Sequence, residues 1–328
     1  GLDRAGPPHP PSPAETIDID LTSDGGVRAA FAELRRRHGP RVASVVHLAA
    51  YYDLSGEPSP LYDEVTVRGT GRLLREAREL EVGQFVFAST MLVHAPVEPG
   101  QRITEDSPLD PRWPYPESKV RTEALIRRER GRVPAVLARI AGVYDDRCHN
   151  AFLARQIARI HERSPLARVF PGDLGHGQTF LHRDDLVDAV VRIVRRRASL
   201  PAELPLLLGE PETLPYGEVQ RLVARLMFGE ELETREIPKA LAKAGAWLED
   251  EVLQEDSFIR PWMIDFADDH YALDTSRARR LLGWEPKHSL RGTLPKMLAA
   301  LHADPPDWYR SNRLEPGLVA LDIPGPLP

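Results

Sequence analysis

Short apolar runs that alternate with amphipathic stretches dominate the hydrophobic pattern of the chain. Residues 42–48, 85–88 and 133–140 are almost entirely apolar, which is typical of strands covered on both faces of a parallel sheet. Residues 27–37 and 67–79 have helical spacing instead, and polar residues precede the first of these stretches. The pattern predicts an α/β fold with a doubly wound parallel sheet.

One stretch within this pattern carries candidate chemistry. The apolar run 85–88 ends in Ser89 and Thr90, at the carboxyl end of a strand, where open α/β sheets bind their ligands. Downstream, Pro116 suits the first position of a helix, and Tyr115 and Lys119 are four residues apart, so both lie on one helical face.

This spacing favours proton transfer. A phenol titrates near ~10 in isolation, and a nearby cation favours the phenolate. Tyr115 is therefore a candidate to exchange a proton with a substrate hydroxyl, while Thr90 holds the same oxygen. The alternative is an exposed tyrosine on a surface helix, because a Tyr-x-x-x-Lys pair alone is a weak motif.

Several motifs in the same order and spacing resemble the extended short-chain dehydrogenase/reductase family, the NAD-dependent epimerase/dehydratase group. The matching residues are 45–50, 87–90 with Val93 and His94, and 115–119 with Glu123, and the resemblance extends over about residues 3–301. It implies a Rossmann-like sheet and hydride transfer between a substrate carbinol carbon and the nicotinamide. In this interpretation Tyr115 is the general acid/base, Lys119 lowers its pKa and Thr90 orients the substrate.

The resemblance also implies a domain organisation. Residues 1–165 with 180–200 are expected to form the dinucleotide-binding domain, and residues 166–179 with 201–303 a smaller substrate-binding lobe. The proline-rich residues 304–328 are expected to be an extended tail.

The family further implies a set of cofactor residues. An acid at the end of the second strand binds the adenosine ribose, so Asp3 favours NAD, although Arg4 keeps NADP open. Including these two, the cofactor-binding residues are expected to be Asp3, Arg4, Asp20, Leu21, Leu48, Ala49, Ala50, Tyr51, Ser89, Tyr115, Lys119, Ile140 and Val143.

The expected substrate-binding residues include two departures from the family. They are Tyr51, Thr90, Met91, Tyr115, Gly142 and Gln178. Where Gly142 and Gln178 stand, sugar-nucleotide enzymes of the family often carry an Asn and an Arg that contact the diphosphate. The sequence is therefore less suited to a nucleoside-diphosphate sugar.

A third departure concerns the amino end. The family's first strand, glycine-rich phosphate loop and following helix have no counterpart before Asp3. We expect either a truncated Rossmann-like domain from a longer gene product or weak dinucleotide binding.

Three functions stay open. The first is an NAD(P)-dependent dehydrogenase or reductase of a small alcohol or ketone. The second is a nucleotide-sugar epimerase or dehydratase, which the overall resemblance favours. The third is a non-enzymatic dinucleotide-sensing protein, against which the intact Thr90, Tyr115 and Lys119 argue, because a sensor needs no proton donor.

The composition and charge of the chain limit the classes of molecule that it is expected to bind. The chain has 328 residues, a net charge of −6 and one cysteine, so the charge does not favour nucleic acid and no internal disulfide forms. No apolar run approaches the ~18 residues that span a bilayer, and no Cys/His cluster has metal spacing. We therefore expect a cytoplasmic enzyme with a small-molecule substrate, no metal site and no membrane contact, and the resemblance implies a homodimer.

Overall fold

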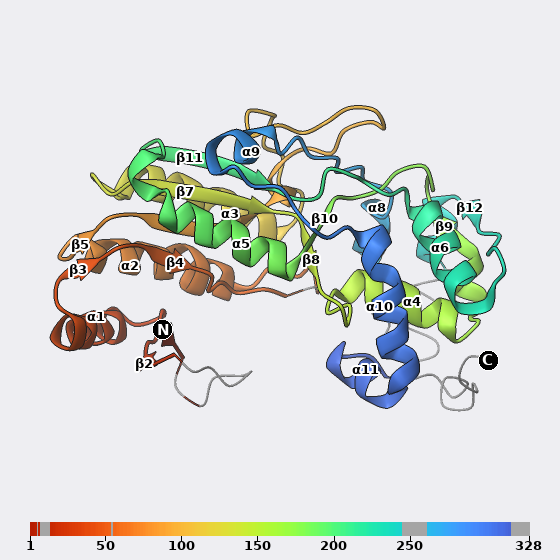
Figure 1. The fold of residues 1–328 in the computed structure, drawn as a ribbon, viewed down its shortest axis with the longest axis horizontal. Coiled ribbons are helices and arrows are strands. Elements are labelled where there is room, and N and C mark those ends of the chain that lie inside the picture. Colours follow the sequence, from red (N-terminus) through yellow and green to blue (C-terminus); the bar gives the residue numbers. More distant parts are fainter. Residues whose placement is uncertain (5, 7–13, 54, 245–260, 316–328) are drawn as a thin grey trace. The chain divides into compact units, whose positions relative to one another are not determined.

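The computed structural model describes residues 1–4, 6, 14–53, 55–244 and 261–315 (Figure 1). Part of the proline-rich tail, residues 316–328, lies outside the described residues. Contacts group the chain into two units. Unit 1 comprises residues 1–95, 107–139 and 190–206, and unit 2 comprises residues 96–106, 140–189 and the described residues among 207–328.

The sheet of unit 1 contains four strands in the order β11-β7-β6-β4. These are β11 (Glu203–Leu208), β7 (Ala135–Ile140), β6 (Phe85–Thr90) and β4 (Val45–His47). β4 pairs with β6 in parallel, with Val45 opposite Phe85. Two further parallel pairs are β1 (Leu2–Asp3) with β2 (Ile17–Asp18), and β3 (Arg41–Val42) with β5 (Glu81–Val82). The predicted α/β class with parallel strands is confirmed.

The prediction of one continuous strand over residues 42–48 is wrong. The run is split into β3 and β4, which pair with different strands. β4 is the edge strand of its sheet, and the side chains near its carboxyl end are uncovered, Val46 being 36% and Leu48 66% exposed. Apolar composition alone predicted that both faces of this strand are buried. At the edge of the sheet, however, β4 has a neighbouring strand on one side only, and the side chains near its carboxyl end stay partly exposed.

The helices of unit 1 follow the predicted spacing with shifted boundaries. α1 (Asp24–His38) begins where the Ser23 side chain accepts a hydrogen bond from Gly26 N–H, and it buries Val27 and Phe31 one turn apart. The helix predicted from residue 67 begins at Tyr62 as a π-helical segment, Tyr62–Arg68, and continues as α2 (Gly69–Ala77). α3 (Pro114–Glu129) packs against both α2 and the π-helical segment.

Unit 2 contains two short parallel strand pairs and a helical core. β8 (Gly142–Tyr144) pairs with β10 (Phe180–His182), and β9 (Val169–Pro171) pairs with β12 (Arg235–Ile237). The helical core consists of α4 (Ala151–His161), α6 (Tyr216–Phe228), α10 (Leu290–Ala303) and α11 (Pro305–Ser311), which bury a shared cluster of apolar side chains (Figure 1). Further α-helices are α5 (Arg183–Arg195), α8 (Pro261–Asp265) and α9 (Ser276–Leu282).

Helix α11 corrects the prediction of an extended tail from residue 304. Its first turn is capped by the Asp304 side chain, which accepts from Asp307 N–H at 3.0 Å, and Pro305 occupies a first-turn position that suits proline. Trp308 is completely buried in the core of unit 2. Prolines that seemed to rule out regular structure therefore start a helix here.

A buried carboxyl group joins the end of β11 to the start of α10. Glu210 is 2% exposed, accepts from Tyr144 O–H at 2.6 Å and accepts from Leu290 N–H at 2.8 Å. Burial raises the pKa of Glu210 to about 7, although both hydrogen bonds oppose that shift.

We predict that Glu210 makes the chain less stable as the pH rises from about 4.5 to about 7. The folded state holds the Glu210 proton more tightly than the unfolded chain does, so the contribution of Glu210 to the free energy of unfolding falls across this range, by up to about 3 kcal/mol, and is constant above it. Urea unfolding at pH 5 and pH 8 measures the difference. Glu210→Gln should shrink it, and Glu230→Gln, at an exposed glutamate, should not; an unchanged difference in Glu210→Gln contradicts this assignment.

Candidate active site

Strand β6 presents its two terminal hydroxyl residues in different directions, as consecutive strand residues must. Ser89 donates to Glu123 Oε1 at 2.7 Å, so its hydroxyl hydrogen is used inside unit 1. Thr90 ends the strand and accepts from Leu92 N–H at 3.3 Å, which starts a short 3₁₀ turn. Met91, expected to line a substrate site, lies in that turn and is only 2% exposed.

Helix α3 brings Tyr115 and Lys119 to the end of β6. The helix begins at Pro114, two residues before the predicted start at Pro116. Lys119 Nζ donates to Ala88 O at 2.7 Å, and it lies 5.5 Å from the centre of the Tyr115 ring. Burial lowers the pKa of Lys119 to about 8, while the charge of Glu123 opposes that shift.

The Tyr115 ring lies between two other aromatic rings. Its centre is 4.9 Å from that of Tyr52, edge to face, and 5.4 Å from that of Trp113. Burial and then Tyr52 raise the pKa of Tyr115, and a hydrogen bond with Thr90 lowers it. Burial therefore dominates the pKa of Tyr115, and the lowering effect of Lys119 stays a prediction. Tyr115 is therefore a neutral phenol, able to donate a proton at neutral pH.

A buried ionic network supports the end of helix α3 against β7. Glu123 is completely buried and accepts from Arg139 Nε at 3.1 Å and from Arg139 Nη2 at 2.7 Å. Arg139 Nη1 also lies 3.0 Å from His94 Nε2, and His94 Nδ1 lies 3.2 Å from Ser107 O. Burial and then Arg139 lower the pKa of His94 to about 4, so this histidine is neutral, with its proton on Nδ1.

This network was not anticipated as a unit. Sequence reasoning took Glu123 and His94 only as motif positions and missed Arg139. A signal was present, since Arg139 stands inside the apolar run 133–140, and a charge in a buried strand requires a partner. Consequently a charged pair, Glu123 and Arg139, holds Ser89 and helix α3 in place.

The expected cofactor residues of unit 1 lie at the carboxyl ends of parallel strands. Asp3 ends β1, and one of its carboxylate oxygens accepts from Arg4 N–H at 2.8 Å. Asp20 follows β2 and accepts from Thr22 N–H at 2.9 Å, with Leu21 beside it. After β4 come the remaining members of this group, Leu48, Ala49, Ala50 and Tyr51.

This arrangement fits part of a dinucleotide. Asp3 offers a carboxylate to ribose hydroxyls, and the uncovered Leu48 with the small Ala49 and Ala50 offers an apolar surface to a flat ring. Thr66 is completely buried and accepts from Tyr51 N–H at 3.0 Å, so it fixes this loop. Among the described helices that follow a strand, none begins with a glycine-rich phosphate loop.

The other expected site residues, Ile140, Gly142, Val143 and Gln178, belong to unit 2. A Cβ atom added to Gly142 would lie 3.0 Å from Phe180 Cδ1, so the phenyl ring occupies the space of a side chain at this position. An Asn at position 142 would not fit unless Phe180 moved. Gln178 forms a parallel bridge with Tyr271.

Two histidines and an aspartate of unit 2, His182, Asp184 and His288, lie close enough together to suggest a metal site. The two imidazole rings are stacked, with centres 4.0 Å apart and planes at 19°. Lone pairs lie in the ring planes, so stacked rings do not aim them at one ion. His182 Nδ1 already accepts from Asp184 N–H at 3.2 Å, and packing explains the cluster.

Comparison with known proteins shows the family to which the chain belongs. Residues 1–205 match the model of the NAD dependent epimerase/dehydratase family. The chain is 30% identical to a UDP-glucose 4-epimerase of Mycolicibacterium smegmatis over 290 residues, which are 86% of this chain and 80% of the relative. It is also 30% identical to 3 beta-hydroxysteroid dehydrogenase type 7 of Homo sapiens over 184 residues, 50% of this chain and 46% of the relative.

A solved structure confirms the Rossmann-like fold. It is a dTDP-glucose 4,6-dehydratase from Bacillus anthracis in complex with NAD, with a TM-score of 0.66 and 18% identity, covering 90% of this chain and 82% of that one. Within the part of this chain that the structure describes, no helix is long and apolar enough to cross a bilayer.

Proposed function

Because the chain belongs to the NAD-dependent epimerase/dehydratase family, we propose that it is an oxidoreductase that moves hydride at a carbinol or carbonyl carbon, with Tyr115 as its proton donor and acceptor. One observation carries the proposal. Thr90, Tyr115 and Lys119 meet within unit 1, where the Thr90 side chain lowers the pKa of the Tyr115 phenol and Lys119 lies 5.5 Å from its ring centre.

The residues of unit 1 have distinct tasks in this proposal. Asp3 holds the adenosine ribose of NAD and disfavours the extra phosphate of NADP, while Leu48 and Ala49 contact flat rings. NAD, when bound, supplies the hydride acceptor or donor at its nicotinamide ring. Thr90 orients the substrate oxygen, and Tyr115 donates a proton to it or takes one from it.

Lys119 compensates charge. A phenolate forms at Tyr115 whenever that group gives up its proton, and the nearby ammonium lowers the free energy of the anion. The pKa of Lys119 is about 8 because of burial, so the ammonium is largely charged at pH 7 and loses its proton above pH 8. We therefore expect enzymatic activity that requires the charged Lys119 ammonium to decline as the pH rises above about 8.

We propose a nucleotide sugar as the substrate class. Support comes from the relatives, which include enzymes named for UDP-glucose and dTDP-glucose. The test is incubation of the chain with NAD and either UDP-glucose or dTDP-glucose, followed by proton NMR of the sugar. A changed configuration at one sugar carbon, or loss of water, is the expected result. Unchanged sugars in both reactions contradict this substrate class.

A second candidate is an oxidoreductase of a ring alcohol that carries no nucleotide. It is favoured by Phe180, which fills the space at Gly142, and by the rings of Tyr52 and Trp113 that pack against Tyr115. The similarity to a hydroxysteroid dehydrogenase agrees with it. NADH formation with a sterol alcohol but not with UDP-glucose would select this candidate. A purely dinucleotide-sensing protein would show neither reaction.

The remaining expectations stay proposals. They are a homodimer through the helices α2 and α3, a cytoplasmic location, and a division into a dinucleotide-binding domain of residues 1–165 with 180–200 and a substrate-binding lobe of residues 166–179 with 201–303. Analytical ultracentrifugation of the chain tests the homodimer. We expect the sedimentation coefficient of a dimer, and the sedimentation coefficient of a monomer would contradict this proposal.

A further inference from the structure

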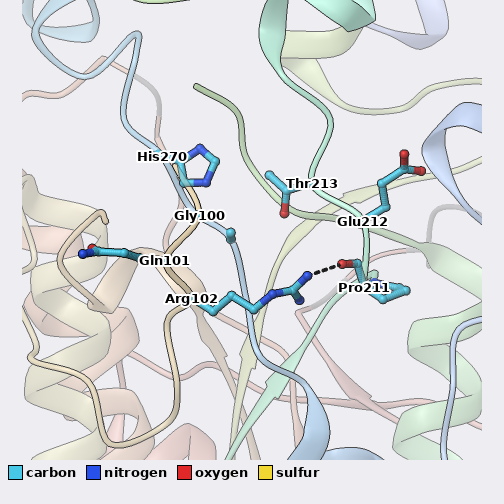
Figure 2. A pocket seen from close by; sticks show the side chains of 8 residues that line it. Gly100, Gln101, Arg102, Pro211, Glu212, Thr213 and His270 are labelled. Carbon is cyan, nitrogen blue, oxygen red and sulfur yellow. Dashed lines mark hydrogen bonds between the residues drawn. The ribbon is translucent and has the colours of Figure 1, made fainter. Parts of the chain in front are cut away.

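Unit 2 contains a cavity of about 580 Å³ that shares no residue with the candidate active site. Three segments form its walls: residues 100–102, residues 211–213, and His270 with Ala272 (Figure 2). The volume is within the range of ligand sites in proteins, roughly 300–1,000 Å³. It is therefore large enough for a metabolite of the size of a sugar.

Hydrogen bonds between the walls form this cavity in advance. Arg102 Nη1 donates to Leu273 O at 3.0 Å and Arg102 Nη2 donates to Pro211 O at 3.3 Å, so one side chain joins all three segments. Ile103 N–H donates to Ala272 O at 2.8 Å. Gly100 has a φ of 90°, which favours glycine, and no atom lies within 4 Å of the place of a Cβ there. A ligand would find the site already built.

The groups that border the hollow are hydrogen-bond donors. Gly177 N–H donates to His270 Nδ1 at 3.1 Å, so the proton of this neutral imidazole is on Nε2. Thr179 is completely buried, accepts from Leu273 N–H and lies 2.8 Å from Thr213 Oγ1. Either hydroxyl can donate in this bond; with Thr179 as the donor, the Thr213 hydrogen is left for a ligand.

Arg102 is the cation among the residues that line the hollow, and its guanidinium has N–H groups beyond the two that bond to the walls. Hydrogen bonds with Ser276 and then the charge of Arg102 lower the pKa of Asp274, so one carboxylate also lies near the guanidinium. Glu212 also lines the cavity, and its carboxylate, which points away from Arg102 in Figure 2, accepts from Arg291 Nη2 at 2.7 Å. Asp274, near Arg102, accepts from Ser276 N–H at 2.8 Å.

We propose that this cavity binds a small metabolite through a carboxylate group, of the class of sugar acids. Arg102, His270 Nε2 and Thr213 Oγ1 donate to the carboxylate, and the remaining volume holds a polyhydroxylated body. One guanidinium balances the single charge of a carboxylate, whereas a phosphate monoester brings up to two charges. The proposal stands independently of the reaction proposed for Tyr115.

Calorimetric titration of the whole chain with glucuronate tests the site, with glucose and glucose 6-phosphate as the other ligands. Saturable binding of glucuronate, at least tenfold tighter than that of either other sugar, is expected. Equal binding of glucose shows that the carboxylate is not recognised, and tighter binding of glucose 6-phosphate selects phosphate instead; either result overturns the proposal, as does no binding of glucuronate.

Substitutions of lining residues test whether glucuronate binds in this cavity. Arg102→Gln should weaken glucuronate binding about tenfold or more, and Thr213→Val about threefold, since each removes a donor to the anion. Arg310→Gln makes the same charge change on α11 and should leave binding unchanged. If Arg102→Gln fails to fold, hydrogen exchange of the unsubstituted chain decides: glucuronate should slow exchange in residues 100–103, and unaltered exchange there contradicts the proposal.

Discussion

Replacing Tyr115 with Phe should lower kcat by about 10²–10⁴-fold while the chain stays folded. The substitution removes only the phenolic oxygen, so the ring keeps its contacts with Tyr52 and Trp113. What is lost is the proton that reaches the substrate oxygen beside Thr90. Steady-state kinetics with the substrate found by NMR, together with the melting temperature, measure the effect.

Tyr52→Phe is the matched control for this prediction. It also removes one phenolic oxygen, and its ring packs edge to face against Tyr115 at 4.9 Å. Tyr52 is 56% exposed and lies outside the proposed group of Thr90, Tyr115 and Lys119. Its kcat should fall less than tenfold. A similar loss of kcat in Tyr52→Phe and Tyr115→Phe would contradict the assignment of Tyr115 as the proton donor and acceptor.

Replacing Arg139 with Met should lower the free energy of unfolding by about 3–5 kcal/mol. The variant leaves the completely buried Glu123 carboxylate without its bidentate partner. Burial by itself raises the pKa of Glu123, and the bonds and charge of Arg139 are what bring it below its ordinary value. Without Arg139, folding must bury the Glu123 carboxylate with only Ser89 and the partly exposed Arg127 as partners, or protonate it. Urea unfolding at pH 7 measures the loss.

Two further variants separate the charge effect from lost packing. Arg139→Met combined with Glu123→Gln removes both charges and should recover a large part of the stability. Arg127→Met removes a partly exposed guanidinium that lies 3.3 Å from Glu123 Oε2, and it should cost about 1 kcal/mol or less. A double variant as unstable as Arg139→Met would show that packing rather than charge dominates.

The sequence predicted the class of the fold because parallel strands leave long apolar runs. It also located β6 and α3, since Thr90, Tyr115 and Lys119 occur in a recognisable order. It did not predict the split between β3 and β4, because which strand lies at an edge depends on pairing partners far away in the sequence. Helix α11 was missed for a related reason, since its stability comes from the burial of Trp308 in a core built by other helices.

The electrostatics of the site were harder to predict than its residues. Spacing placed Tyr115 and Lys119 on one helical face, yet the pKa of Tyr115 is raised by burial and by the nearby Tyr52. Neither is visible in a spacing of four residues. Arg102 and His270 are 168 residues apart in the chain, so the cavity that they border has no local sequence signal.

Calorimetric titration of the chain with NAD, and separately with NADP, tests the central claim most directly. The account predicts saturable binding of NAD at one site per chain, weaker binding of NADP, and a smaller difference between the two in Asp3→Asn, since that variant no longer repels the additional phosphate. Absence of NAD binding, or tighter binding of NADP, would contradict the proposed NAD-dependent reaction at Tyr115.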